Sequence, residues 1–465
     1  MVALTERKIA IVRTLVESAP DRVVGRLQEA LVESDGDSAL AGVRRLVEIE
    51  ARDRRLRNAV LLPVAAMCVG DGVNDRRLTF PSRALSCLWQ GLKDLAPDVI
   101  AAIGGASPAG DDEASTRAVD ATNRSCDALT RLAASALRVR EQRDFVMAVE
   151  LCDRARPGGA EMLAACLDLA PVVRRAAARL PDWIGHPGDD TAAASRLAYK
   201  DAVVIADDAG PRFFEMVAAQ LSPHWMILRV ISAVMDKPTE RYMADSEVGG
   251  FGEAVMSEID EALVAIGKLD LDGGAEAGRA AGRLVELVSL QTSELEACIE
   301  LSRDHGWGRR IVNQRKALAS VVEARLRDAE KTVAAALPTE MASKQRMRRK
   351  LPCLTAPPEA RALTRAKTLL AFTQAIRSSA NYAGFSAAHA KTMENVGALI
   401  DHYVEDVLDY VKTGDVEDVN IAAAFLAVAA DFCETIRDEK AAALIRRRAA
   451  VACHGEGPAQ PNAHA

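Results

Sequence analysis

Aromatic residues are scarce in this 465-residue chain, where Phe, Trp and Tyr together make up 4% of the sequence. β-Sheets favour aromatic and β-branched residues, whereas helices pack closely through Ala and Leu, which dominate the apolar residues here. Apolar residues still reach 49% and charged residues 27%, so the chain can bury a sizeable core. The composition therefore favours helices over strands.

Paired cysteines are also missing. The nine cysteines are scattered along the chain, and no two of them form a Cys-x-x-Cys pair. This spacing fits neither a zinc site nor a disulfide framework. Scattered cysteines on apolar helix faces are typically small buried hydrophobic residues of proteins in a reducing compartment. We therefore expect a cytoplasmic protein without a metal site.

Long apolar runs are lacking as well. The longest, Ala59–Val69, is interrupted by Pro63 and falls short of the ~20 residues that a membrane-spanning helix needs. The first twenty residues carry several charges, among them Glu6, Arg7 and Lys8, and lack the apolar core of a signal peptide. We expect no transmembrane segment.

The net charge of −7 disfavours nucleic acid as a partner of the whole surface. One local exception is a basic run that contains Lys344, Arg346, Arg348, Arg349 and Lys350. This run could dock on an acidic protein, an anionic membrane surface or phosphate, or it could be a solvated helix face. It contains no aromatic side chain on which a base could stack, which disfavours single-stranded nucleic acid.

Apolar residues recur at three- and four-residue spacing along most of the chain, which is the helical period. The clearest stripe consists of Leu399, Ile400, Tyr403, Val404, Val407, Leu408 and Val411. No sustained alternation of the kind that marks a half-buried strand is present. We predict an all-α fold, either an elongated multi-helix bundle or an irregular α-solenoid of antiparallel helix pairs, with no β-sheet.

Segments rich in Gly, Pro and charged residues interrupt the helical pattern at 104–116, 181–191 and 338–358. After Cys453 the pattern stops altogether. The predicted regions are an N-terminal helical region (1–103), a central region of long helices (115–337), a basic Pro-rich hinge (338–358), a C-terminal helical bundle (359–452) and a disordered tail (454–465).

The string Gly-Asp-Gly-Val-Asn-Asp at 70–75 resembles the Mg²⁺-binding loop of haloacid-dehalogenase-type phosphatases and P-type ATPases. That resemblance implies a nucleophilic Asp in a DxDx[TV] motif after an upstream strand. The upstream candidate at 35–38 follows a helical segment and leaves no room for an α/β domain, and the string at 269–273 comes after the loop. We interpret 70–75 as a turn between helices, because Gly, Asp and Asn suit turns.

Other catalytic and ligand-binding motifs are absent. The sequence contains no HExxH, no GxSxG, no Walker loop and no GxGxxG after a strand. None of the seven histidines follows Asp or Glu by three residues, so the di-iron bundle arrangement is missing. We predict no catalytic residues, no cofactor and no metal, and we lean against an enzyme. A site assembled from dispersed residues stays open.

Two further features concern helix packing. Gly274, Gly278 and Gly282 recur at spacing four, which favours a close helix crossing or a weak first part of a helix. Trp307, Arg309 and Arg310 lie where one long helix is expected to follow another. The tryptophan could fill the corner between these helices, or the three residues could form a contact for a partner, because Trp and Arg are enriched in such contacts.

The preferred prediction is a non-enzymatic cytoplasmic scaffold or adaptor that acts through protein–protein contacts, with a homo-oligomer as one form. One alternative is a peripheral binder of an anionic membrane or nucleic acid through residues 344–350. The other is an all-α enzyme or small-ligand binder whose site forms only on folding. A buried cluster of carboxylates, His and Arg would support this last alternative.

Overall fold

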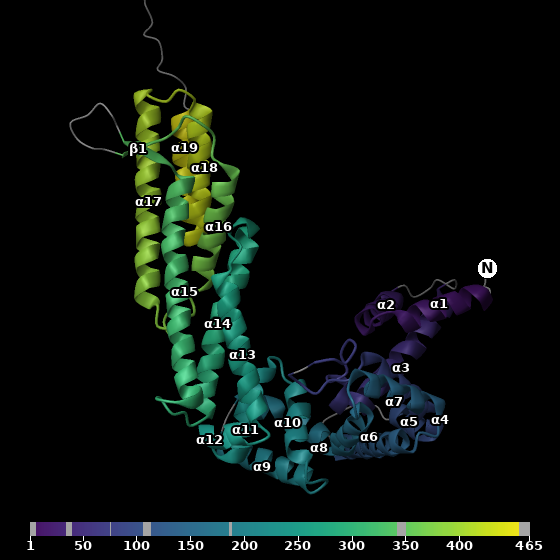
Figure 1. The fold of residues 1–465 in the computed structure, drawn as a ribbon. Helices are drawn as coiled ribbons and strands as arrows, with labels where there is room; N and C mark the ends of the chain where they lie inside the picture. Colours follow the sequence, from purple (N-terminus) through teal and green to yellow (C-terminus); the bar gives the residue numbers. More distant parts are fainter. Residues whose placement is uncertain are drawn as a thin grey trace, which may run out of the picture. The chain divides into compact units, whose positions relative to one another are not determined.

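The computed structural model describes residues 6–33, 40–74, 76–105, 113–185, 188–341 and 350–454. These residues form nineteen α-helices, two 3₁₀ helices and two strands of three residues each (Figure 1). The predicted all-α class is confirmed. The helices form because the apolar residues keep the helical period over long stretches, so that each helix has a face to bury.

The packing divides the chain into two compact units. Unit 1 comprises Met1–Pro238 and Met243–Phe251, and unit 2 comprises Thr239–Tyr242 and Gly252–Ala465. This division follows packing, whereas the five regions predicted above follow composition. The boundaries of those regions therefore stay predictions.

Unit 1 is organised around α8, an apolar helix that packs against α3, α6, α7, α9 and α10. Its helices are α1 (Glu6–Ser18), α2 (Asp21–Glu33), α3 (Ala41–Ala65), α4 (Ser82–Leu95), α5 (Pro97–Gly105), α6 (Glu113–Val139), α7 (Arg143–Ala155), α8 (Gly159–Gly185), α9 (Asp189–Val203), α10 (Ala209–Ala219), η1 (His224–Met226) and α11 (Ile227–Met235). The expected break at 181–191 is shorter than predicted, because α8 continues through Pro181. Burial of Leu180 and Trp183 around that proline stabilises the last turn.

Unit 2 consists mainly of long helices. The elements that follow α11 are α12 (Glu240–Asp245), α13 (Gly249–Gly267), η2 (Leu271–Gly273), α14 (Gly274–Cys298), α15 (Gly306–Ala336), β1 (Thr339–Met341), β2 (Lys350–Pro352), α16 (Ala360–Ala375), α17 (Ser386–Thr413), α18 (Val419–Ile436) and α19 (Glu439–His454). The first two of these, α12 and α13, contribute residues to both units.

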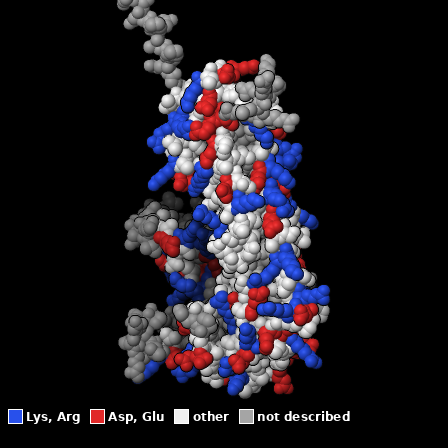
Figure 2. Space-filling model, turned by 90° about the vertical axis from the view of Figure 1, so that its left-hand side faces the viewer, with Lys and Arg blue, Asp and Glu red and all other residues white. Residues whose placement is uncertain are grey.

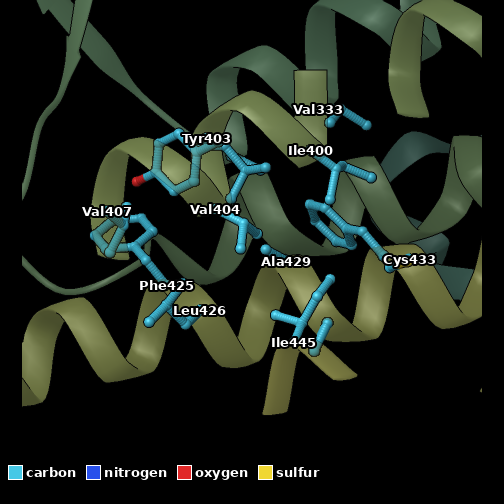
Figure 3. Packing of buried hydrophobic residues seen from close by; sticks show 14 of the residues in the cluster. Val333, Ile400, Tyr403, Val404, Val407, Phe425, Leu426, Ala429, Cys433 and Ile445 are labelled. Carbon is cyan, nitrogen blue, oxygen red and sulfur yellow. The ribbon is translucent and has the colours of Figure 1, made fainter. Parts of the chain in front are cut away.

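The stripe predicted at 399–411 lies on α17 and faces the core of unit 2. Tyr403, Val404 and Val407 are buried against Phe425 and Leu426 of α18 (Figure 3). The rings of Tyr403 and Phe425 meet edge to face, with centroids 6.0 Å apart. Helical periodicity alone therefore identified this interface correctly.

A small two-stranded sheet departs from the expectation of no β-sheet. The strands β1 and β2 pair antiparallel, with Thr339 opposite Pro352 and Met341 opposite Lys350. Three residues per strand are too few to produce the alternating pattern that predicts a strand from sequence. The pairing gives backbone groups on both sides of residues 342–349 hydrogen-bond partners.

Within the described residues, α18 is the helix long and apolar enough to cross a membrane, with a mean hydropathy of 1.6 over eighteen residues. In the structure, Phe425, Leu426 and Phe432 of this helix are buried in the core of unit 2. Core helices meet the same criteria of length and composition, so α18 is weak evidence for a membrane span.

The glycine series marks a close crossing of α14 and α16. A Cβ atom added at Gly278 would lie 2.0 Å from the carbonyl oxygen of Thr368, and one added at Gly282 would lie 2.4 Å from the Cβ of Ala375. Gly274 does not take part in this crossing. It begins α14 at a φ of +70°, a backbone conformation that favours glycine. The close crossing predicted from the four-residue spacing is confirmed.

Candidate functional site

A groove runs along α8 within unit 1. It consists of three adjoining hollows of about 1080, 530 and 480 Å³, and neighbouring hollows share lining residues. Val172, Arg175 and Asp201 belong to the first and second hollows, and Asp168 and Ile205 to the second and third. We refer to the three hollows together as the α8 groove.

Helices on either side form the walls of the α8 groove. Residues of α6, from Val119 through Arg131 to Arg138, line one side. Residues of α9 and of the segment leading into α10 line the other, including Leu197 and Ile205. Residues of α8 form the floor, and Leu62 of α3 and Gln220 also line the first hollow. The arrangement therefore leaves a trough between two helices, above a third.

Buried hydrogen bonds hold α8 against α3 and α6. The guanidinium group of Arg174 donates to the Asp127 carboxylate at 3.1 Å and to the backbone carbonyls of Ala59 and Val60. Arg174 is only 8% exposed, so its charge needs these partners. This arginine therefore holds the floor of the groove against α6, which forms one of its walls.

Large apolar side chains are exposed along the groove. Among those lining it, Leu62 is 42% exposed, Val119 44%, Leu197 62%, Val204 86% and Ile205 43%. The floor between them is built partly from Ala176, Ala177 and Ala178. Single exposed apolar residues are ordinary, but a set of them around one concave surface marks a binding site.

Charged side chains alternate with these apolar residues. Arg138 pairs with Glu161 and Asp168 at 2.9 and 2.8 Å, and Arg212 pairs with Asp208 at 2.6 Å. Burial lowers the pKa of Arg138, but its hydrogen bonds to the two carboxylates outweigh this and raise it. The hydrogen bond from Arg212 lowers the pKa of Asp208. These carboxylates and guanidinium groups are therefore already paired with one another.

Other arginines of the groove form weaker ion pairs or none among the described residues. Arg175 lies 3.9 Å from Asp201, and the two side chains are 60% and 50% exposed. Arg131 and Arg179 are exposed, and they have no ion-pair or hydrogen-bond partner in the described part of the chain. The unpaired charges that the groove presents to a ligand are therefore guanidinium groups.

A second polar group surrounds Glu215 on α10. The backbone N–H of Leu78 donates to its carboxylate at 3.3 Å, and the Arg77 side chain contacts the ring of His224. Burial raises the pKa of Glu215, and this outweighs the lowering by the Leu78 hydrogen bond and by the charges of Arg77 and Arg156. This is a carboxylate, His and Arg cluster of the kind that supports the small-ligand alternative.

The loop that resembles a Mg²⁺-binding motif lies next to this cluster, and Asp75 falls outside the described residues. The Asp71 carboxylate accepts from the N–H of Val73, and the Asn74 side chain accepts from the N–H of Arg76. Gly70 and Gly72 have φ values of +52° and +81°. These features agree with the interpretation as a turn between α3 and α4.

Of the basic residues predicted as a contact segment, Lys344, Arg346, Arg348 and Arg349 lie outside the described residues. Lys350 is exposed on β2. The role of this segment stays a prediction. On the face shown in Figure 2, basic and acidic side chains of the described residues alternate, without a field of one sign.

The other predicted contact residues lie at the start of α15. Trp307 is 6% exposed, and its indole N–H donates to Glu253 at 2.6 Å. Arg310 pairs with Glu253 and Asp260, whereas Arg309 is exposed. The indole packs against Gly252, where a Cβ would lie 2.5 Å from the ring. Trp307 therefore fills the corner, and a partner contact at Arg309 and Arg310 stays a prediction.

A buried carboxylate that the sequence analysis missed stabilises the same corner. Glu240, 9% exposed, accepts hydrogen bonds from the backbone N–H groups of Ser302, Trp307 and Gly308 at 3.1, 2.8 and 3.1 Å. Two of these donors are among the first N–H groups of α15, which have no partner within the helix. The negative charge also interacts favourably with the positive end of the helix dipole.

The cysteines offer no cluster of ligands. Cys68, Cys152 and Cys166 are buried, and burial raises the pKa of the Cys152 and Cys166 thiols to about 12. Such thiols stay protonated at neutral pH and react slowly. Among the described residues, no group of three or more His, Cys, Asp or Glu side chains is placed to hold a metal ion.

Comparisons with protein-family models, with curated proteins and with solved structures found no match to this chain. Of the two candidates, the α8 groove has both volume and exposed apolar surface, whereas the Glu215 cluster is a set of polar groups that contact one another. One weak feature of the sequence could have indicated the groove, namely the apolar pair Val204-Ile205, which belongs to no helical stripe.

Proposed function

We propose that this chain is a non-enzymatic scaffold or adaptor of the cytoplasm, which binds a segment of another protein in the α8 groove. The observation that carries the proposal is the trough between α6 and α9, with exposed apolar side chains along its length. Grooves of this form bind amphipathic helices, whose apolar face covers such side chains. Burial of Leu197 and Val204 by a partner would contribute about 1.5–3 kcal/mol for each side chain fully removed from water.

The proposal is tested by photo-crosslinking in the native host. The photoreactive residue p-benzoylphenylalanine replaces Leu197, which is exposed in the groove, and in a control protein it replaces Leu444 on α19, which is 55% exposed. We expect a peptide from a partner protein to be crosslinked to position 197. The same peptide should not be crosslinked to position 444. Crosslinks that are identical at the two positions, or absent at 197, would contradict the proposal.

A second candidate function is small-ligand binding, which the Glu215 cluster favours. A carboxyl group whose pKa is raised by burial, next to two arginines and a histidine, is an arrangement often found in active sites. If this cluster binds a ligand, Glu215→Gln changes ligand affinity while Leu197→Glu leaves it unchanged. Isothermal titration with metabolite mixtures would distinguish the two sites.

A further inference from the structure

The α8 groove has a form and a charge pattern that specify the kind of partner segment. We infer that it binds an amphipathic helix whose apolar stripe is flanked by Asp and Glu residues. This inference rests on the proposed function and adds the chemistry of the partner. It follows from the length of the groove, the small residues of its floor and the arginines that line it.

The length of the groove decides between a small molecule and a helix. Residues from Glu161 to Ile184 of α8 line its floor, and at 1.5 Å per residue this stretch is about 35 Å long. A small ligand fills ~300–1,000 Å³ and would occupy one of the three hollows. A helix of about twenty residues would cover all three.

The floor allows a helix to approach closely. Ala177 and Ala178 line the first hollow on α8, and Ala194 and Ala198 line it on α9. Small side chains let two helix axes come within the ~8–10 Å of ordinary helix packing. The exposed side chains of Leu62, Val119 and Leu197 stand around this floor, where they can contact an apolar stripe.

The charges that line the groove set the sign of the partner. The carboxylates of Glu161, Asp168 and Asp208 are each within 2.9 Å of an arginine. Among the described residues, Arg131 and Arg179 have no ion-pair partner, and Arg175 and Asp201 are 3.9 Å apart. Two guanidinium groups are therefore unpaired, whereas every carboxylate of the lining already faces an arginine, so an incoming carboxylate is favoured over an incoming Lys or Arg. Complementary charges of this kind select the partner more than they add affinity.

The test uses two designed peptides of twenty residues that share one apolar helical stripe. One peptide carries Glu on both sides of the stripe, and the other carries Lys at the same positions. Binding of each fluorescently labelled peptide to the full chain is measured by anisotropy. The variants are the double change Arg131→Glu with Arg179→Glu, and the control Arg377→Glu, an exposed arginine of unit 2. All three positions are on the surface, so folding is retained and is checked by circular dichroism.

We expect the Glu peptide to bind the unchanged protein more tightly than the Lys peptide. The double change should weaken binding of the Glu peptide on the order of tenfold, because two attractive charge pairs become repulsive. It should strengthen binding of the Lys peptide, because two repulsive pairs become attractive. The Arg377→Glu control should leave both affinities unchanged. Equal binding of the two peptides, or binding that ignores the double change, would overturn the inference.

The crosslinking experiment separates this inference from the proposed function. A peptide recovered at position 197 with Asp and Glu beside an apolar stripe supports both. A recovered peptide that is basic or lacks helical periodicity overturns the inference and leaves the adaptor proposal standing. A lipid or another small molecule at position 197, in place of a peptide, overturns both.

Discussion

At the scale of single residues, the buried Glu240 and the half-buried Glu215 accept hydrogen bonds from distant parts of the chain. Glu240 accepts three backbone hydrogen bonds at the start of α15, and Glu215 lies among arginines beside the 70–80 loop. Both residues act across large separations in sequence, so neither belongs to a local motif. Each leads to a prediction that can be measured.

Glu240→Ala should destabilise unit 2 strongly. The change leaves three buried or half-buried N–H groups without their acceptor, at about 1–3 kcal/mol each, so we expect a loss of at least about 3 kcal/mol. Glu240→Gln keeps one acceptor oxygen and should lose less. Urea denaturation followed by circular dichroism measures both, with Glu323→Ala, an exposed glutamate of α15, as control. A Glu240→Ala protein as stable as the control would disprove the assigned role.

Glu215→Gln should change how stability depends on pH. Burial raises the pKa of Glu215 in the folded state, so its stabilising contribution is complete below the unfolded pKa of ~4.3 and is lost as pH rises through the folded value. Glutamine does not titrate, so the Tm of Glu215→Gln relative to the unchanged protein should rise between pH 4.5 and 8.

A glutamate with the opposite shift provides the control for this pH experiment. The hydrogen bond from Arg448 lowers the pKa of Glu405. Its stabilising contribution is present above the unfolded pKa and is lost as pH falls. The Tm of Glu405→Gln relative to that of the unchanged protein should therefore decrease as pH rises. Parallel curves for Glu215→Gln and Glu405→Gln would contradict the assignment.

At the scale of helices, the backbones of α14 and α16 pack closely where Gly278 and Gly282 face α16. The carbonyl oxygen of Thr368 occupies the space where a side chain of Gly278 would begin. Periodic glycines indicated a close crossing, although the sequence did not say which helix crosses there. The partner helix begins more than eighty residues later, at Ala360.

Gly278→Ala should destabilise the protein even though alanine is the better helix former. Alanine contributes about 1 kcal/mol more than glycine within a helix, but its Cβ would lie 2.0 Å from a backbone oxygen that cannot rotate away. We expect a net loss of about 2–3 kcal/mol, which is typical of overpacking. Gly25→Ala in α2, with no atom near its added Cβ, should instead be neutral or stabilising. Thermal denaturation of both variants checks the sign.

At the scale of the whole molecule, the helices differ widely in how much apolar surface they bury. Near the N-terminus, the cluster around α1, α2 and α3 has four buried hydrophobic side chains, namely Val16, Val24, Val47 and Ala51. The cluster around α17 and α18 has twenty-two. Because local unfolding becomes easier where fewer apolar contacts hold a segment, the two regions should open at different rates.

Hydrogen exchange measured by mass spectrometry should therefore rank the helices. We expect the amides of α1 and α2 to exchange at least about a hundredfold faster than those of α18, because that ratio corresponds to burial of only one or two more side chains. Equal protection of α2 and α18 would show that packing outside these clusters holds the N-terminal helices in place.

The sequence by itself predicted the helical class and the stripe of α17, and it indicated a close crossing at the glycine series as one of two interpretations, because each depends on the spacing of residues within one helix. It could not determine the α8 groove, the Glu240 hydrogen bonds or the Glu215 cluster. Glu240 lies 67 residues from Trp307, and the groove takes its walls from α6 and α9, which flank α8 on different sides of the sequence. Only tertiary packing brings such residues together, since no period within a helix records which other helix will lie beside it.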